Sequence, residues 1–202
     1  MPLLGKAAVV IWCEIDAALR AEHDAWHSGE HLPERMAIPG FLRGRRCVAA
    51  DTAAPWPYFI LYEVEDASVL TSAAYLERLN NPTPWSRKIQ AACRLSRTLC
   101  RVTSSQGDGV GAHLVTAKLA STAPLLDFGG RPGVVAVHLL ERDRSVQRPR
   151  TNEESIRRGG ADEAVERVLI VEGYDGAALQ QALSRQELAA DRYVLSHLMV
   201  AA

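Results

Sequence analysis

The order of strand-like and helix-like segments in the first half of this chain restricts its fold most strongly. Four segments combine apolar alternation with β-branched and aromatic residues, which is typical of strands. They are residues 3–12, 41–50, 57–64 and 95–104. Helical spacing separates the first two strands and the last two. The expected helices are residues 16–31, 67–79 with a break near 71–72, and 84–92. The order is therefore strand-helix-strand-strand-helix-strand.

The second half repeats this order less completely. Its expected strands are residues 111–119, 132–141, 166–172 and 191–200, with one clear helix at 177–187 that Asp175 can cap. Between the first two strands only residues 122–130 are available, which leaves room for about two helical turns. Residues 104–109 have the composition of a linker. We interpret the chain as a duplication with a degenerate second copy, divided into residues 1–104 and 110–202.

Each copy predicts a ferredoxin-like unit, in which helices cover one face of a four-stranded antiparallel sheet. The other face of each sheet must also be buried. Two such sheets can pack face to face and curl into a barrel within one chain. The expected fold class is therefore α+β, with tandem ferredoxin-like βαββαβ repeats whose antiparallel sheets form an intrachain α+β barrel. Residues 142–162 are rich in charge and poor in apolar residues, and we expect a long mobile loop there.

Composition excludes several classes of protein. The chain has 202 residues and a formal net charge of −1, which gives no electrostatic reason to expect nucleic acid or an anionic membrane as a partner. No stretch approaches the roughly 18 apolar residues of a membrane span, and no N-terminal stretch resembles a signal peptide. The four cysteines lack CxxC spacing, which argues against a zinc knuckle or a disulfide framework. Buried, reduced thiols in a cytoplasmic protein are expected.

Titratable side chains are concentrated on the first expected helix. His23, His27 and His31 are spaced by four residues and share one stripe, while Glu30 and Glu34 form a neighbouring stripe. Trp26 lies between them. A Pro-Gly turn at positions 39–40 then leads into the next strand.

Three segments carry a family resemblance. They are EHLPERMAIPGFLRGRR at residues 30–46, YFILYEVED at 58–66 and YLERLNNPTPWSRKI at 75–89. Together they resemble the dimeric α+β-barrel superfamily, and within it the small EthD-like bacterial proteins. The resemblance covers residues 3–104 well and 110–202 only by strand order. It implies the ferredoxin-like barrel, but it does not select a function, because the superfamily includes cofactor-free monooxygenases, haem enzymes, cyclases, isomerases and proteins without known activity.

The titratable helix admits three interpretations. His27 to His31 matches the H-x-x-E-H pattern of some zinc enzymes, but Gly29 weakens the helix and no third ligand is evident. Alternatively, His31 is an acid-base group in a cleft between helix and sheet, as in superfamily enzymes that need no cofactor. The interpretation that we place first is architectural. In it, Glu30 and Glu34 pair with Arg35 or with a strand arginine, and His31 donates to a backbone carbonyl.

Two function classes remain open. The first is an α+β-barrel protein that binds a small apolar molecule in a helix-sheet cleft without catalysis. The alternative is a cofactor-independent monooxygenase, cyclase or isomerase that uses His31 as acid or base. The candidate catalytic residues are His31, Glu30 and Glu34, and the candidate ligand-binding residues are Trp26, His27, Tyr58 and Trp85. We expect no metal and no cofactor. The expected partner is a small apolar or aromatic ligand, with neither nucleic acid nor membrane, and a homodimer of tandem-repeat chains is compatible with the resemblance.

Overall fold

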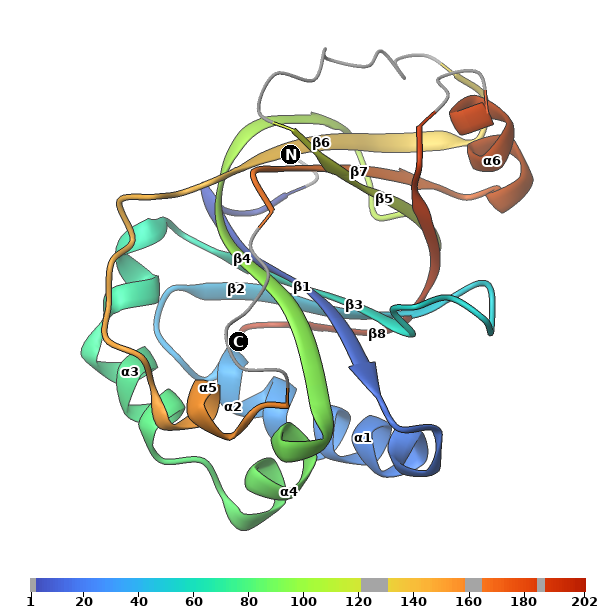
Figure 1. Cartoon of the computed structure of the whole chain (residues 1–202). Helices are drawn as coiled ribbons and strands as arrows, with labels where there is room; N and C mark the ends of the chain where they lie inside the picture. The colour runs from blue at the N-terminus through green and yellow to red at the C-terminus, as the bar shows by residue number, and fades with distance from the viewer. Residues whose placement is uncertain (1–2, 121–130, 159–164, 185–187) are drawn as a thin grey trace.

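The strands of the chain close into an α+β barrel (Figure 1). The computed structural model describes residues 3–120, 131–158, 165–184 and 188–202. Within them the strands are β1 (Ala7–Ile15), β2 (Phe41–Ala49), β3 (Tyr58–Val64), β4 (Cys93–Gly107), β5 (His113–Leu119), β6 (Val134–Arg142), β7 (Arg167–Gly173) and β8 (Asp191–Val200). All neighbours in the order β1-β3-β2-β8-β5-β7-β6-β4 are antiparallel, and β4 returns to β1. The predicted fold class is confirmed.

The strands of the first half, β1 to β4, and those of the second half, β5 to β8, have equivalent orders around the barrel. The first four follow the order β4-β1-β3-β2, and the last four follow β8-β5-β7-β6. The halves join edge to edge, because β2 pairs with β8 and β4 pairs with β6. The sheets are thus one continuous closed sheet rather than two separate ones packed face to face. The origin of this order by duplication, with two domains, stays a prediction.

The segment predicted to be a linker is part of a strand. β4 continues to Gly107, and its last residues pair with β6 from Ser104 opposite Leu139 to Gly107 opposite Ala136. The linker prediction is wrong over these residues. Their small and polar side chains are half-exposed or exposed, which is why the composition resembles that of a linker. The strand forms all the same, because the hydrogen bonds between paired strands come from the backbone.

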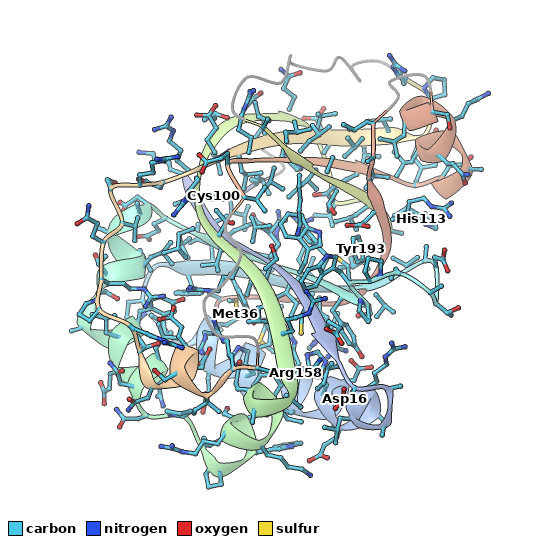
Figure 2. All side chains as sticks on the ribbon, viewed as in Figure 1. Asp16, Met36, Cys100, His113, Arg158 and Tyr193 are labelled. Carbon is cyan, nitrogen blue, oxygen red and sulfur yellow. The ribbon has the colours of Figure 1, made fainter. Side chains whose placement is uncertain are left out.

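Alternate residues of the strands fill the inside of the barrel and the space beneath the helices. On β1, Val10 and Trp12 belong to the inner core, in which Tyr193 also lies (Figure 2). Val9 and Ile11 point outward and pack in the core beneath the helices. This burial on both faces explains the nearly continuous apolar run in β1. Tyr58 and Tyr62 of β3 share this outward face.

Helices lie outside the barrel and are concentrated on the first half. A 3₁₀ turn at Ala17–Leu19 leads into α1 (Arg20–Trp26), a π-helical turn (His27–His31) and α2 (Leu32–Met36). The other helices are α3 (Ala73–Asn80) and α4 (Pro84–Ala92), α5 (Asn152–Ile156), and α6 (Gly176–Ser184). Figure 1 shows α1 to α5 together beside the first half, whereas α6 lies on the second half. No helix of the described residues is both long and apolar enough to cross a membrane.

The first helical segment differs from the sequence prediction at both ends. It continues beyond His31 to Met36, and Asp16 precedes it without making a side-chain cap. The turn before Pro33 is wide, because Leu32 N–H donates to the carbonyl of His27, five residues earlier. Proline has no N–H to continue the α-helical ladder and its ring crowds the carbonyl four residues earlier, which accounts for a widened turn at this place.

The predicted loop at residues 142–162 contains ordered structure. α5 begins with a capping box, in which Thr151 accepts from Glu154 N–H and the Glu154 carboxylate accepts from Thr151 N–H. Glu153 and Arg157 are buried against the first half. The loop prediction is therefore wrong for the helical residues 152–156, because Glu153 and Glu154 find arginine partners. Residues 159–162 of this expected loop lie outside the described residues, as do the expected helical turns at 122–130 and the end of the helix predicted at 177–187.

A chain of buried ion pairs crosses the inside of the barrel. The Glu63 carboxylate accepts from Arg43 at 2.8 Å and pairs with Arg45 at 3.1 Å. Arg45 also pairs with Glu172 at 2.7 Å, and Glu172 contacts His138 Nε2 at 3.1 Å. Burial alone would raise the pKa of Glu172, but His138 and Arg45 lower it to about 2. Arg45 and Glu172 therefore tie a strand of the first half to one of the second.

We expect Gly44→Ala to destabilise the protein. A Cβ at Gly44 would lie 2.3 Å from Leu32 Cδ1 and 3.1 Å from Met36 Cε, at the point where α2 crosses β2. Because Leu32 is fully buried, the clash should cost about 1–3 kcal/mol. Gly29→Ala is the matched control, because a Cβ there meets nothing within 4 Å and alanine favours helix. Thermal melting should show a fall of several degrees for the first variant and none for the second. Equal melting temperatures would contradict the close packing of α2.

Candidate functional site

A cavity lies between the helices and the outer face of the first half. Strands β1, β3 and β4 contribute an apolar wall that includes Val9, Ile11 and Ile60. The helices contribute His23, Trp26, His27, His31 and Arg35, and α5 with the residue after it contributes Glu153 and Arg157. The space open to the centre of a water molecule is about 30 Å³, which is room for roughly two or three waters. The empty cavity is therefore nearly closed by its own side chains.

His31 is buried in this cavity without a hydrogen bond. The residue is only 7% exposed, and its ring packs at a tilt against Trp26, with 4.3 Å between ring centroids and 34° between planes. Within the described part of the chain, neither ring nitrogen has a hydrogen-bond partner. Trp26 is fixed in turn, since its Nε1–H lies 3.1 Å from Ser86 Oγ and 3.2 Å from Glu30 Oε1. The fixed indole of Trp26 therefore positions the imidazole of His31, whose two nitrogens have no hydrogen-bond partner among the described residues.

His27 and Tyr62 form a second polar pair in the cavity. His27 Nε2 lies 3.1 Å from the Tyr62 hydroxyl, and among the described residues Nδ1 of His27 is buried without a partner. The ring centroids of His27 and His31 are 5.7 Å apart. Burial raises the pKa of Tyr62, so this phenol stays protonated and can donate a hydrogen bond.

Burial keeps both histidines neutral. For His31, burial is the main cause of a pKa well below 6.5, and the charges of Arg35 and Arg157 lower it further. For His27, burial acts together with the neighbouring His31 and His23. Neutral imidazole carries a free lone pair, so His31 is in the protonation state of a proton acceptor.

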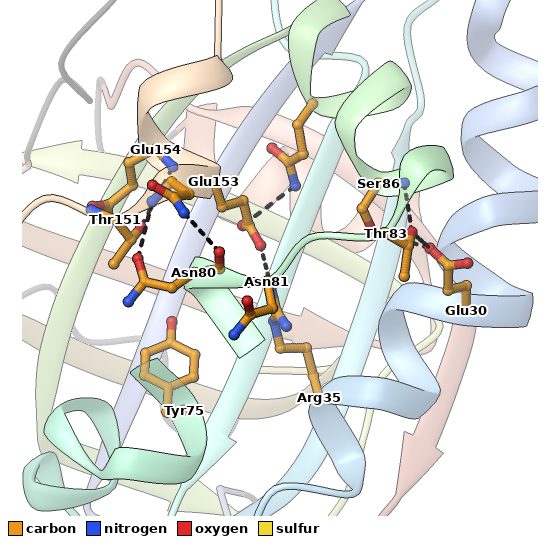
Figure 3. Close-up of polar contacts among 12 residues, drawn as sticks. Glu30, Arg35, Tyr75, Asn80, Asn81, Thr83, Ser86, Thr151, Glu153 and Glu154 are labelled. Atoms are coloured by element: carbon orange, nitrogen blue, oxygen red, sulfur yellow. Dashed lines mark hydrogen bonds and ion pairs between the residues drawn. The ribbon is translucent and has the colours of Figure 1, made fainter. Parts of the chain in front are cut away.

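The opposite end of the cavity is charged. Glu153 accepts a hydrogen bond from Arg35 (Figure 3). It also accepts from Arg157, and Gln90 Nε2 lies 3.4 Å from it. Beside this group, Arg97 Nη2 donates to the Tyr75 hydroxyl at 2.8 Å. The cavity thus runs from an aromatic end with His31 to an end rich in guanidinium groups.

The structure brings together some of the predicted site residues. His31, Trp26 and His27 line the cavity, whereas Tyr58 and Trp85 do not. Tyr58 stacks on His23 with 4.4 Å between centroids, and Trp85 is half-buried against the helical core. Both remain neighbours of the cavity rather than walls of it.

The expected roles of the two glutamates differ from what the structure shows. Glu30 accepts from Thr83 Oγ1 at 2.6 Å and Ser86 Oγ at 3.0 Å, which joins α4 to the π-helical turn (Figure 3). Glu34 is half-buried outside the cavity. Among the residues that the structure describes, neither carboxylate contacts His31 or pairs with an arginine. The architectural interpretation is therefore wrong in its contacts, and orientation of His31 comes from Trp26 instead.

Sequence reasoning missed the charged end of the cavity. Arg35 and Glu153 are 118 positions apart, and Glu153 lies in a segment that its composition assigned to a mobile loop. Only the capping-box pattern of Thr151 and Glu154 could have indicated a helix there. No group of three or more His, Cys, Asp or Glu side chains in the described ranges is arranged to hold a metal ion, so the H-x-x-E-H pattern finds no further ligand.

Comparison with known proteins identifies the fold. No family model and no curated protein sequence matches the chain. An anthrone oxidase-like protein of known structure is similar over 100% of this chain and 96% of its own, with a TM-score of 0.61 and 9% identity. A candidate monooxygenase from Fusobacterium nucleatum matches over 98% and 96%, with a TM-score of 0.55 and 8% identity. A candidate chlorite dismutase matches over 95% and 94%, with a TM-score of 0.54 and 13% identity. These likenesses show the α+β-barrel fold, while membership of the dimeric α+β-barrel superfamily and the closer kinship to EthD-like proteins stay predictions.

We expect His27 and His31 to remain neutral at pH 6.5, where histidines of the unfolded chain are half protonated. Ring-nitrogen NMR shifts in the folded and the denatured protein measure this difference directly. Because the unfolded chain binds these protons more readily, the free energy of unfolding should fall as the pH drops below about 6.5. Protonation of both rings at pH 6.5 in the folded protein would contradict their desolvation.

Proposed function

We propose that this chain is a small-molecule enzyme that binds a planar aromatic compound in the cavity and removes a proton from it with His31. The supporting observation is the buried, neutral ring of His31, which has no hydrogen-bond partner among the described residues. Buried polar groups are normally hydrogen-bonded, so an unpaired one that faces a cavity suggests a role toward a ligand. Trp26 offers a fixed surface for a flat ring beside it.

The substrate class that fits this site is an aromatic carbon acid. The likeness to an anthrone oxidase-like protein suggests, by analogy of fold, a ketone with an acidic CH₂ between aromatic rings. His31 accepts the proton, and the electron pair delocalises toward the ketone oxygen. The Tyr62 hydroxyl can donate to that developing oxyanion. Dioxygen is the oxidant, and the overall change R₂CH₂ + O₂ → R₂C=O + H₂O is balanced.

One observation favours a second function, which is binding without catalysis. The empty cavity has only about 30 Å³ of free space, so a planar ligand requires its walls to move. A protein that merely closes around a small apolar molecule would show the same packed cavity. Turnover of a carbon acid separates the two functions.

Oxidation of anthrone, followed by oxygen uptake and the absorbance of anthraquinone, tests the proposal. His31→Phe should abolish oxidation above the buffer blank, because the base is removed while the ring on Trp26 is kept. The melting temperature should change by no more than about 4 °C, since no hydrogen bond within the described residues is lost. His113→Phe, on β5 outside the cavity, is the control and should retain activity.

Retained activity in His31→Phe would contradict the role of the base. Binding of anthrone to the wild type without any oxidation would support the second function.

A further inference from the structure

A carboxylate of the chain itself occupies the charged end of the cavity. Glu153 is 3% exposed, and its two oxygens accept from Arg35 Nη2 and, at 2.7 Å, from Arg157 Nη2. Gln90 approaches from α4. The donors therefore come from three separate places, namely α2, α4 and the residue after α5. Such a convergent set of donors is what a buried carboxylate of any origin needs.

Glu153 is ionised in this position. Burial alone would raise its pKa, but the charges of Arg35 and Arg157 lower it below the ordinary value. Arg35 has donors to spare, because its Nε and Nη1 have no hydrogen-bond partner among the described residues. These donors belong to a side chain that lines the cavity.

Arg35 also lies on the same helical face as His31, which belongs to the aromatic end of the cavity. It follows His31 by four residues, which puts the two side chains on the same helical face about one turn apart. The charge of Arg35 contributes to the low pKa of His31, which agrees with this proximity. A rigid aromatic ligand of two or three rings that stacks on Trp26 can therefore present an acidic group to Arg35.

α5 is a short element of the cavity wall. It has five residues and belongs to the connection between β6 and β7 of the second half. At its start, Asn152 N–H donates to Asn80 Oδ1 at 3.1 Å and Asn152 Nδ2 donates to the Asn80 carbonyl at 2.7 Å (Figure 3), and both bonds are exposed to water. Glu154 also pairs with Arg97 at 3.1 Å, and Arg158 N–H donates to the Cys93 carbonyl at 3.0 Å. The other walls are strands of a closed sheet and longer helical segments, so α5 is the wall whose movement leaves the barrel intact.

We propose that Arg35 and Gln90 form a binding site for the acidic group of an aromatic ligand, and that Glu153 fills this site until the ligand carboxylate displaces it. On displacement Glu153 leaves Arg35 and keeps its pair with Arg157, which directly follows α5. The exchange keeps the arginines paired, so it avoids the cost of a buried unpaired charge. It also moves α5 outward and makes room in a cavity that is otherwise too small. This inference rests on the cavity being the ligand site of the proposed function, but not on catalysis by His31.

Calorimetric binding of two probes tests the proposal. Anthraquinone-2-carboxylate carries the acidic group, and 2-(hydroxymethyl)anthraquinone is its neutral counterpart. The wild type should bind the carboxylate at least tenfold more tightly. Glu153→Gln removes the internal competitor and should strengthen carboxylate binding by a further tenfold or more, with little effect on the neutral probe.

A second variant keeps the test valid if Glu153→Gln does not fold. Asn152→Ala loosens α5 without changing any charge and should strengthen carboxylate binding several-fold. Asn81→Ala is its matched control, because Asn81 donates to the Glu77 carbonyl in the adjoining turn and holds no part of α5. Its affinities should equal those of the wild type.

Three results would overturn the proposal. They are equal affinities for the two probes, weaker carboxylate binding by Asn152→Ala or by folded Glu153→Gln, and no carboxylate binding by the wild type. Failure of the proposed catalysis is distinguishable, because His31→Phe should bind the carboxylate as tightly as the wild type even where it has no activity.

Discussion

Hydrogen bonding between β2 and β8 and between β4 and β6 closes the barrel, and the position of every other element depends on this closure. Without these two seams each half would expose two strand edges and one apolar sheet face. With them, the inner face is filled by side chains such as Trp12, Phe59 and Tyr193. The ion pairs of Arg45 with Glu63 and Glu172 lie in the same interior and link β2 to β3 and to β7. Because the interior is packed, space for a ligand lies between the helices and the outer face.

The same closure brings the second half to the cavity of the first. The β4–β6 seam places the end of β6 beside β4, and the connection that follows reaches across the first half as α5 (Figure 1). Glu153 thereby meets Arg35 although the two are far apart in sequence. The cavity consequently combines an aromatic end built locally, on one helix, with a charged end that exists only after the barrel has closed. Burial is the main cause of the low pKa of His31, and Arg35 from the same helical segment and Arg157 from beside α5 lower this pKa further.

The parts of this fold that depend on local pattern were predictable. Side chains of the strands point alternately into and out of the barrel, as the alternation in their sequences predicts. α4 and β8 occupy the ranges expected from proline, capping and apolar spacing. The stripe of His23, His27 and His31 also follows from helical periodicity, and all three side chains line the cavity. The partners of Glu30 and Arg35 did not follow, because carboxylates and arginines accept many partners and only tertiary contacts select among them. α5 was missed because a charged five-residue helix has no apolar face, and its burial depends on ion pairs with another half of the molecule.

The most direct test of this account is a crystal structure of the protein with anthraquinone-2-carboxylate bound. We expect the ring system to lie against Trp26 with His31 beside it, the carboxylate to contact Arg35, and Glu153 to have left this arginine together with α5. A ligand bound elsewhere on the molecule, or one bound in the cavity while Glu153 still pairs with Arg35, would contradict this expectation.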